Sequence, residues 1–544
     1  MSKQQTCQRY IFKIHSARLR NCGWKLNLPL TEARKNQELV SLSDSQMLRF
    51  IDSLNNIEDA DTIAKSIQKQ IKRLRKESDS AVNRHKIKKL YEKLDEIQHK
   101  PDYMCLIIDR EKDYWRACKG FTINGVKYVR LLGTTGGVKN STIVFVSERL
   151  YPELKRRIDN GRNMEKEMVP AKLEAYQALT CSGSIPVSFP KGIAVVDDCF
   201  THFKADVVNI ADGDPGQEPK MWFEKDAEVE VADSDGYGLM LPSLADRWSE
   251  ELKLGYTACG MNTRFAWEKG MVFTFDFLDF ADNVAGTRII KDAWGNTVDL
   301  SDVELILPVS MVKLWDSYDS CDDYVWNSVS NGYTFGIPKT TPESLENERA
   351  LNYQFIQSYD LSDEDIDELI APTVSNIHDI LSFDWRKTIL FLQGIGLNED
   401  NIEDLNSNFA KAIMIDRRVM NDSYVRRKIF DMIKERITDA KLGVLNVHGN
   451  YSIISGDPYA FCQSIFGLPV TGLLKSGEIY NKYWLDCGAD KLACFRAPMS
   501  CHENIRKVTV NRSEEAQYWF RYMNACTALN AWDTMTHALN GADK

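Results

Sequence analysis

The sequence predicts an α+β protein of several domains, in which two β-rich regions flank a helical block. Short β-branched runs alternate with Gly, Asp and Pro turns between Ile193 and Trp315, which favours a compact β-barrel over alternating strand–helix units. Residues 340–445 have a helical pattern, and a second mixed β region begins near Val444. A length of 544 residues, at about 150 residues per domain, predicts three or four domains.

An amphipathic and basic stretch precedes the barrel region. Between residues 62 and 100 apolar residues recur every three or four positions, and a polar break at 77–83 divides the pattern, so we expect a helical hairpin. This stretch has 12 Lys/Arg against 5 Asp/Glu, although the whole chain has a net charge of -10. The positive charge could bind a nucleic acid, or it could be the solvated outer face of two packed helices.

Composition excludes several classes of protein. No apolar run approaches the roughly 18 residues that cross a bilayer, and the N-terminus lacks the apolar core of a secretion signal, so we expect a cytoplasmic protein without a membrane partner. The 13 cysteines are an odd number, and no pair has the spacing of a zinc motif. We therefore expect reduced thiols rather than disulfides.

Two acidic clusters and one glycine-rich segment are interpreted as turns. Asp212 and Asp214 flank a glycine and precede a proline, as exposed turn residues do. The segment from Asp233 to Gly236 begins like a calcium-binding loop, but Leu244 stands where that loop needs a bidentate Glu. Residues 133–137 are glycine-rich but lack the Gly-Lys-Ser/Thr ending of a phosphate-binding loop.

Three basic residues occur in apolar or extended surroundings. Lys269 stands just before Gly270 and a strand-like run, and Lys313 stands within the apolar segment 303–315, so each cation could be held by a rigid barrel strand. Such lysines can also extend from a core to solvent without a function. Arg496 precedes an Ala-Pro pair, which favours an extended backbone.

Taken in order, these motifs resemble RNA polymerases built on two double-psi β-barrels. The resemblance is strongest to the single-chain group that contains the eukaryotic RNA-silencing RNA-dependent polymerases and their phage-encoded relatives, and it covers about 190–320 and 445–544. The corresponding stretches are SDGYG at 234–238, EKGM with Lys269, LPVSMVKLW with Lys313, FRAPMSCHENIRKV with Arg496, and LNGADK, which contains Asp543.

The resemblance implies a site for nucleotidyl transfer. Two Mg²⁺ ions would be held by clustered carboxylates, of which Asp543 would be one, as both metal ligand and catalytic residue. Lys269 and Lys313 would be catalytic cations that neutralise the charge developing on the triphosphate, and Arg496 would bind the incoming nucleotide through its ribose hydroxyls. The partners implied are NTPs, a DNA or RNA template and the RNA product.

The sequence departs from the family pattern at the metal loop. Only the first Asp of the expected D-x-D-G-D motif is present, because the sequence stops at Lys544, directly after Asp543. We therefore expect an N-terminal portion that is inactive alone and that a C-terminal chain or segment completes. His502 lies one residue further from Arg496 than in the multisubunit polymerases, so it is given no role.

The expected organisation combines the pattern with the resemblance. It consists of an N-terminal region at 1–100 with the basic hairpin at 62–100, a mixed α/β region at 101–190, a first double-psi-like barrel with both lysines at 191–320, a helical connector at 321–444, and the start of a second such barrel at 445–544, which is cut at the catalytic loop.

The leading functional hypothesis is a template-dependent RNA polymerase of the phage DNA-directed type. An RNA-dependent RNA polymerase of the same fold is the alternative within the family, because both would share the metal and lysine chemistry. A hypothesis from another class is a non-catalytic nucleic-acid-binding or scaffold protein, in which the hairpin binds and the barrels are structural.

Overall fold

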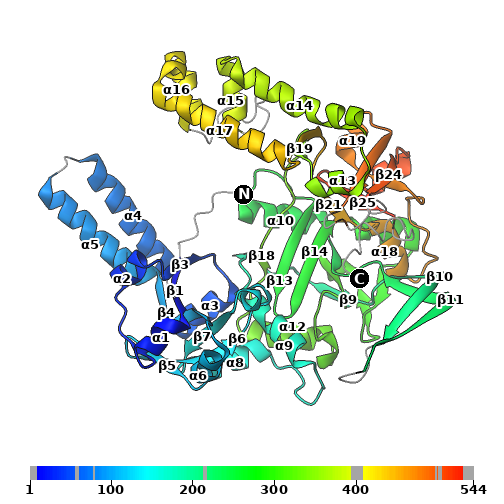
Figure 1. The fold of residues 1–544 in the computed structure, drawn as a ribbon. Coiled ribbons are helices and arrows are strands. Elements are labelled where there is room, and N and C mark those ends of the chain that lie inside the picture. The colour runs from blue at the N-terminus through cyan, green and yellow to red at the C-terminus, as the bar shows by residue number, and fades with distance from the viewer. Residues whose placement is uncertain are drawn as a thin grey trace. The chain divides into compact units, whose positions relative to one another are not determined.

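The structure is a computed structural model that describes residues 9–55, 60–77, 80–211, 217–393, 408–496, 499 and 505–530 (Figure 1). The chain forms two compact units. The first comprises Met1–Thr341 and Pro458–Thr471, and the second comprises Pro342–Asp457 and Gly472–Lys544. Each unit has its own buried apolar clusters.

The first sheet of unit 1 has seven strands in the order β2-β5-β6-β7-β4-β1-β3. These strands are β1 (Arg9–His15), β2 (Lys25–Leu26), β3 (Leu39–Leu42), β4 (His99–Ile107), β5 (Phe121–Ile123), β6 (Val126–Leu132) and β7 (Thr142–Ser147). The helices among them are α1 (Ser16–Asn21), α2 (Leu30–Lys35), α3 (Gln46–Leu54), α6 (Glu111–Cys118), α7 (Thr135–Lys139), α8 (Tyr151–Asp159) and α9 (Pro170–Gln177). Strand β7 is buried throughout because its alternate residues face two cores: Phe145 packs with Phe12 and Tyr128, whereas Val144 and Val146 pack with the barrel-region core.

Helices α4 (Ala60–Lys76) and α5 (Ala81–Gln98) form a hairpin between α3 and β4. The apolar positions meet in a small core of Ala64, Ile67, Ile71 and Leu94. The Ser80 side chain caps α5 by accepting a hydrogen bond from the Asn83 backbone N–H at 3.1 Å. Figure 1 shows the two helices side by side, extending away from the first sheet.

The second sheet of unit 1 has seven strands in the order β8-β18-β13-β14-β12-β17-β9. They are β8 (Ile185–Pro186), β9 (Ile193–Val196), β12 (Tyr237–Met240), β13 (Gly260–Phe265), β14 (Glu268–Thr274), β17 (Leu305–Pro308) and β18 (Gly336–Ile337). Other elements of this region are the ribbon β10 (Phe200–Ala211) and β11 (Lys220–Ala232), the pair β15 (Ile289–Lys291) and β16 (Thr297–Asp299), and helices α10 (Pro242–Leu252), α11 (Phe277–Phe280), α12 (Cys321–Ser330) and α18 (Pro458–Ile465). Trp248 of α10 is completely buried against this sheet, and its indole N–H donates to the Ser188 carbonyl at 2.9 Å.

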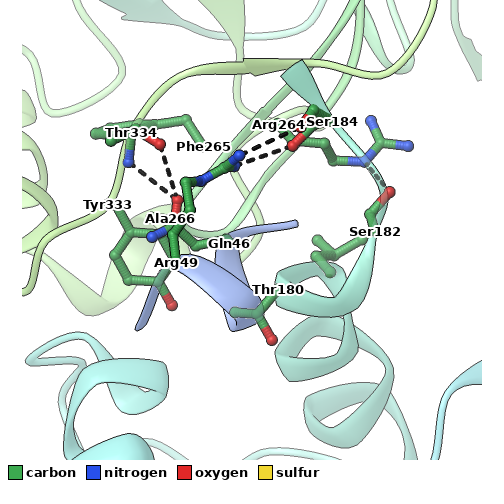
Figure 2. A pocket seen from close by; sticks show the side chains of 11 residues that line it. Gln46, Arg49, Thr180, Ser182, Ser184, Arg264, Phe265, Ala266, Tyr333 and Thr334 are labelled. Atoms are coloured by element: carbon green, nitrogen blue, oxygen red, sulfur yellow. Dashed lines mark hydrogen bonds between the residues drawn. The ribbon is translucent and has the colours of Figure 1, made fainter. Parts of the chain in front are cut away.

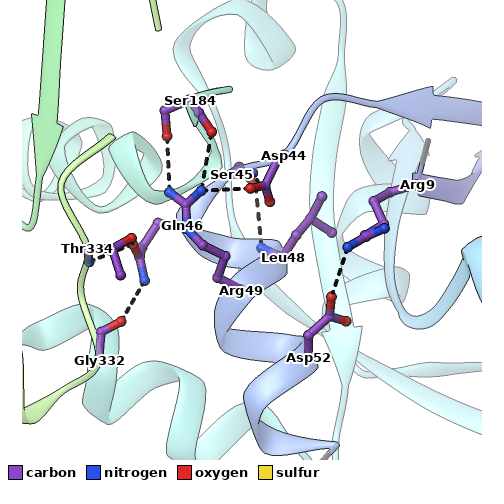
Figure 3. Close-up of polar contacts among 10 residues, drawn as sticks. All are labelled: Arg9, Asp44, Ser45, Gln46, Leu48, Arg49, Asp52, Ser184, Gly332 and Thr334. Atoms are coloured by element: carbon purple, nitrogen blue, oxygen red, sulfur yellow. Dashed lines mark hydrogen bonds and ion pairs between the residues drawn. The ribbon is translucent and has the colours of Figure 1, made fainter. Parts of the chain in front are cut away.

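Helix α3 is tied to the loops of the second sheet by two side chains (Figure 3). The Gln46 amide donates to the Gly332 carbonyl at 2.9 Å and accepts from the Thr334 backbone N–H at 3.1 Å. The Arg49 guanidinium donates to Asp44 at 2.9 Å and to the Ser184 hydroxyl at 3.1 Å. These residues line a small cavity between α3 and β13, in which the Gln46 amide and the terminal nitrogens of Arg49 are hydrogen-bonded, whereas the buried Arg49 Nε has no hydrogen-bond partner among the described residues (Figure 2).

The helices of unit 2 pack around a separate core. They are α13 (Tyr353–Ser358), α14 (Asp363–Leu381), α15 (Trp385–Gln393), α16 (Asn408–Ile415) and α17 (Ser423–Lys441), which follow β19 (Glu348–Ala350) and lead to its partner β20 (Asn446–His448). The acidic start of α14 is a capping box: the Ser362 hydroxyl accepts from the Asp365 N–H at 3.2 Å, and the Asp365 carboxylate accepts from the Ser362 N–H at 2.9 Å. Ile380, Ile413 and Ile429 are buried in the core that these helices share.

The sheet of unit 2 has five strands in the order β21-β25-β22-β24-β23. They are β21 (Ile453–Ser455), β22 (Glu478–Tyr480), β23 (Lys491–Phe495), β24 (Ile505–Val510) and β25 (Cys526–Leu529), with α19 (Lys482–Asp486) and α20 (Glu514–Trp519) between them.

The two units contain the same five-stranded arrangement. In unit 1 the spatial order β13-β14-β12-β17-β9 has antiparallel, parallel, antiparallel and parallel neighbours in turn. In unit 2 the order β23-β24-β22-β25-β21 has the same sequence of pairings. In each unit, numbering these strands along the chain gives the spatial order 3-4-2-5-1. The fold therefore repeats one unusual strand topology, and each of these five strands in one unit has a counterpart in the other.

Two further observations bear on the sequence expectations. Among the described residues, none of the helices combines the length and the apolar character that a bilayer crossing requires. The eleven cysteines that the structure describes are all free thiols, which agrees with the prediction of reduced cysteines. The expected domain boundaries stay predictions.

Candidate functional site

Four chain segments meet at one edge of the second sheet of unit 1. Strands β9 and β17 are parallel, so the residues that follow both strands lie at the same edge. Strand β12 is antiparallel to β17 and parallel to β14, so the residues that begin β12 and β14 lie at this edge too. The four segments are 197–199, 233–236, 309–314 and the start of β14 at Glu268 and Lys269.

Asp198 joins three of these segments. Its Oδ1 accepts hydrogen bonds from the Ser234 hydroxyl at 2.6 Å and from the Ser310 hydroxyl at 2.7 Å, and its Oδ2 accepts from the Ser310 N–H at 3.0 Å. The Ser310 hydroxyl also accepts from the Gly236 N–H at 3.0 Å. The carboxylate is 8% exposed, so these bonds operate away from competing water. Asp198 therefore fixes the backbone of the loop that contains Lys313.

The fold brings Lys269 and Lys313 together. The Lys269 N–H donates to the Met311 carbonyl at 3.0 Å, and the Lys313 N–H donates to the Trp267 carbonyl at 3.1 Å. A β-bridge between Glu268 and Val312 lies between these two bonds. The two lysines thus belong to paired antiparallel segments, and their charges are close enough to interact.

Lys313 lies in a turn rather than on a barrel strand, so the expectation of a strand was wrong at this residue. Strand β17 ends at Pro308, and the Ser310 N–H is directed to Asp198 instead of a neighbouring strand. The Met311 N–H then closes a turn onto the Pro308 carbonyl at 2.9 Å. The Lys313 ammonium donates to the Ser310 carbonyl, so the turn restrains the cation as a strand would. Lys269, by contrast, lies on strand β14 as expected, although its side chain is exposed.

Gly270 allows the lysine segments to approach each other. A Cβ atom at this position would lie 2.4 Å from the Met311 Cε atom and 2.6 Å from the Gly236 carbonyl oxygen. Because the second contact is to backbone, it could be relieved only by moving the loop before β12. The glycine that follows Lys269 is therefore required by the packing of the site.

Charge and burial set the protonation of Lys313. Burial lowers the pKa of its ammonium, and the positive charge of Lys269 lowers it further. The negative charges of Asp235, Asp198 and Glu268 oppose this shift. The site is therefore a pair of cations balanced by nearby carboxylates, which suits the binding of a group with several negative charges.

Glu268 is a completely buried carboxyl group beside the lysines. The Thr263 hydroxyl donates to its Oε1 at 2.5 Å, whereas its Oε2 has no hydrogen-bond partner among the described residues. Burial raises the pKa of Glu268 to about 7, although the Thr263 hydroxyl and the positive charges of Arg264 and Lys313 oppose the shift. The carboxyl group is thus poised to titrate near neutral pH.

Glu268→Gln is expected to change how stability depends on pH. Between pH 4.5, the ordinary pKa, and about 7 the unfolded chain loses a proton that the folded chain keeps, so the free energy of unfolding of the natural protein falls as pH rises through this window. The amide has no such loss. Urea unfolding should show the variant gaining stability relative to the natural protein from pH 4.5 to 7 and keeping that gain at pH 8.

The exposed Glu250 of α10 supplies the matched control, since Glu250→Gln makes the same chemical change outside the core. A stability difference between Glu268→Gln and the natural protein that stays constant from pH 4.5 to 8 would contradict the assignment.

Other carboxyl groups of this edge are also perturbed. Burial raises the pKa of Asp233 to about 7, opposed by a hydrogen bond from the Thr201 hydroxyl. Burial also raises the pKa of Asp197, and the charges of Asp198 and Asp292 add to the shift. Perturbed carboxyl groups gathered beside paired lysines are typical of functional sites.

The remaining predicted site residues lie elsewhere. Arg496 is half-buried in unit 2 and directly follows β23. Because β23 corresponds to β13 of unit 1, the residue of unit 1 at the equivalent position is Ala266. Asp543 lies outside the described residues, as do Asp212, Asp214 and His502. Within the described part of the chain no group of three or more His, Cys, Asp or Glu residues is arranged to hold a metal ion. The role of Asp543 as a Mg²⁺ ligand stays a prediction.

Sequence reasoning did not identify Asp198, Ser310 or Glu268. A signal for Asp198 was available, because it follows the apolar run 193–196 by two residues, where a buried strand ends. Glu268 directly precedes Lys269 in the same motif, but its burial follows from the tight turn between β13 and β14. Ser310 had no signal apart from its place in the lysine motif.

Comparison with known proteins identifies relatives. No protein family model matches the chain. It is similar to the DNA-directed RNA polymerase YonO of Bacillus phage SPbeta, with 28% identity over 415 residues that cover 74% of this chain and 46% of YonO. It is also similar to the solved RNA-dependent RNA polymerase QDE-1 from Thielavia terrestris, with 15% identity, a TM-score of 0.48, and coverage of 80% of this chain and 47% of that one.

The chain thus spans less than half the length of each of these two relatives. The resemblance to RNA polymerases that the motifs indicated is confirmed by the sequence similarity to the phage enzyme.

Proposed function

We propose, from the premise that this chain is a relative of a phage DNA-directed RNA polymerase, that it takes part in template-dependent RNA synthesis. The observation that carries the proposal is the pairing of Lys269 and Lys313 at one sheet edge, on segments fixed to each other by backbone hydrogen bonds. Two cations on paired segments at one place are suited to a triphosphate, whose charge grows as the pyrophosphate departs.

The repeated strand topology supports a fold with two double-psi β-barrels. In each unit the five strands have the spatial order 3-4-2-5-1, with antiparallel and parallel neighbours in alternation. This order needs connections that cross, as we expect of a double-psi β-barrel. The first arrangement holds the lysines. The second contains Arg496 at the end of β23, and Asp543 follows its last strand, β25, in the sequence.

The proposed roles follow from the chemistry of each side chain. Lys269 and Lys313 bind the triphosphate and offset its charge in the transition state, which requires fixed cations rather than proton transfer. Arg496 donates hydrogen bonds to the ribose hydroxyls of the incoming nucleotide. Asp543 is a hard oxygen ligand suited to Mg²⁺, which supplies activation of the attacking 3′-hydroxyl when bound.

We take the template to be DNA, as the name of the phage relative states for that enzyme. RNA is the alternative template, because the lysine and carboxylate chemistry would serve both. A non-catalytic nucleic-acid-binding protein is the alternative from another class, and it predicts binding without nucleotide addition.

The test is incorporation of labelled NTPs by the polypeptide that contains residues 1–544 together with the C-terminal segment proposed to complete the metal loop, on single-stranded DNA and RNA templates with Mg²⁺. We expect RNA product on DNA, dependent on template, abolished by EDTA and by Asp543→Asn. If product forms on RNA templates and not on DNA templates, the protein is RNA-directed and the DNA-directed assignment is wrong. Tight nucleic-acid binding without product from any template would establish the non-catalytic alternative.

A further inference from the structure

The hairpin of α4 and α5 carries a dense positive charge on its outer surface. Between residues 65 and 89 the sequence has ten Lys/Arg and two Asp/Glu, in a chain whose net charge is -10. All eleven Lys/Arg of the two helices are exposed. The acidic residues of α5 gather toward its end, where Asp95 pairs with Arg34 at 2.7 Å. The positive charge therefore increases away from the body of unit 1.

The lysines follow the helical repeat along each helix. Lys65, Lys69, Lys72 and Lys76 are spaced by four, three and four residues, which places them on one side of α4. Lys86, Lys89 and Lys93 form a similar line on α5. At about 1.5 Å per residue, the α4 line is about 16 Å long, and the same length of duplex carries about ten phosphate charges.

The hairpin is rigid enough to present these lines as a surface. Its apolar residues pack between the helices, and the Arg75 guanidinium of α4 donates to the Tyr91 hydroxyl of α5 at 3.0 Å. Helix α5 continues directly into β4 at His99. The next residue, Lys100, is buried and pairs with Asp52 of α3. The exposed cations thus stand on a support that is anchored in the first sheet.

We propose that this hairpin is an accessory site for the sugar–phosphate backbone of a nucleic acid, separate from the lysine pair of the second sheet. The inference rests on the proposed function for the identity of the polyanion. An anionic membrane is the less suitable partner, because surface-bound helices insert a continuous apolar face, and most apolar residues here pack inside the hairpin, with Ile63 and Val82 as separate exposed side chains. Contacts of this kind give affinity without base specificity, so the site would hold template or product of any sequence.

The test compares two sets of four substitutions in the polypeptide that contains residues 1–544. The first changes Lys65, Lys69, Lys72 and Lys76 to Gln. The control changes four exposed lysines elsewhere in unit 1 to Gln, so that the net charge is matched; they are Lys112, Lys119, Lys139 and Lys172. The probe is a fluorescein-labelled 30-base-pair DNA duplex, and the measurement is the anisotropy-derived Kd at several KCl concentrations.

We expect the hairpin variant to bind the duplex at least about tenfold more weakly at 0.1 M salt, with the slope of log K against log[salt] reduced by about 3 to 4. The control should bind like the natural protein. Lysine-to-arginine substitution at the same four hairpin positions should restore both values, which separates loss of charge from loss of folding. A second variant with Lys86, Lys89 and Lys93 changed to Gln should be weakened in the same way.

Equal affinity of the hairpin and control variants would overturn the proposal. So would a hairpin variant that loses binding to phosphatidylserine vesicles while keeping its affinity for the duplex. The proposed function fails by a different result: natural protein that binds the duplex through the hairpin and adds no nucleotide to any template.

Discussion

Replacing Lys313 by alanine is expected to lower the rate of templated nucleotide addition by about 10²–10³-fold, the typical cost of removing one preorganised electrostatic contact to a transition state. The ammonium is held by the Ser310 carbonyl and by the backbone pairing of its turn to Trp267. Because the ammonium is already in place, no free energy is lost in reorienting the side chain when charge develops on the triphosphate. Lys269→Ala should have a smaller effect, because Lys269 is exposed to water.

Single-turnover incorporation by the polypeptide that contains residues 1–544 measures this prediction. Lys313→Arg should recover part of the rate, because it keeps the charge but changes its position. Lys112→Ala is the control, an exposed lysine of the first sheet region. If Lys313→Ala and Lys112→Ala add nucleotides at the same rate, Lys313 has no catalytic role.

Asp198→Ala is expected to lower the free energy of unfolding by at least about 3 kcal/mol and to abolish nucleotide addition. The carboxylate accepts three hydrogen bonds, from the Ser234 hydroxyl and from the backbone and hydroxyl of Ser310. Each bond to a charged group contributes about 1.5–3 kcal/mol, and the donors left behind are buried. Without them Ser310 is no longer fixed to the segment after β9, although the Val309 N–H still donates to the Val196 carbonyl of β9 at 2.9 Å, so the Ser310 carbonyl that holds the Lys313 ammonium is less firmly positioned.

Urea unfolding and hydrogen exchange of the Ser310 amide measure this effect. Asp198→Asn is the matched control: it keeps the shape and one acceptor oxygen, so it should retain part of the stability. Ser310→Ala should remove one of the three bonds to Asp198 and the bond from the Gly236 N–H, and it should keep the other two bonds to Asp198. An Asp198→Ala variant as stable as the natural protein, with an equally protected Ser310 amide, would show that Asp198 does not organise the site.

Local periodicity predicted much of the fold. The three- and four-residue spacing of isoleucines and leucines at 62–100 predicts two helices, and α4 and α5 lie there. The helical pattern of residues 340–445 also agrees with the structure, in which α14 and α17 lie there. These features depend on residues close in sequence, so no tertiary information is needed.

The features that the sequence could not reveal depend on distant contacts. One exception is local: the glycine-rich segment at 133–137 is predicted to be a turn, but the Thr134 hydroxyl accepts from the Gly137 N–H at 3.0 Å and caps the short helix α7. Lys313 lies in a turn because the Ser310 N–H donates a hydrogen bond to the Asp198 carboxylate, which is more than a hundred residues away in the sequence. The burial of Glu268 likewise depends on packing of several strands.

The candidate site likewise contains residues that could be predicted from the sequence and residues that could not. Lys269 and Lys313 could be identified because their motifs stand in the order that the polymerase family shows. The carboxyl groups that surround them could not, because single acidic residues at strand ends are common in any β protein. Arg496 and Asp543 stay predictions, the first in unit 2 and the second outside the described residues.

The proposed function requires that the ammonium groups of Lys269 and Lys313 together bind the triphosphate of an incoming nucleotide. A structure of the polypeptide that contains residues 1–544, determined with template, Mg²⁺ and an NTP analogue that cannot react, tests it most directly. We expect the Nζ atoms of both lysines to lie about 3 Å from triphosphate oxygens. A triphosphate bound away from both lysines, with their ammonium groups contacting only protein or water, would contradict it.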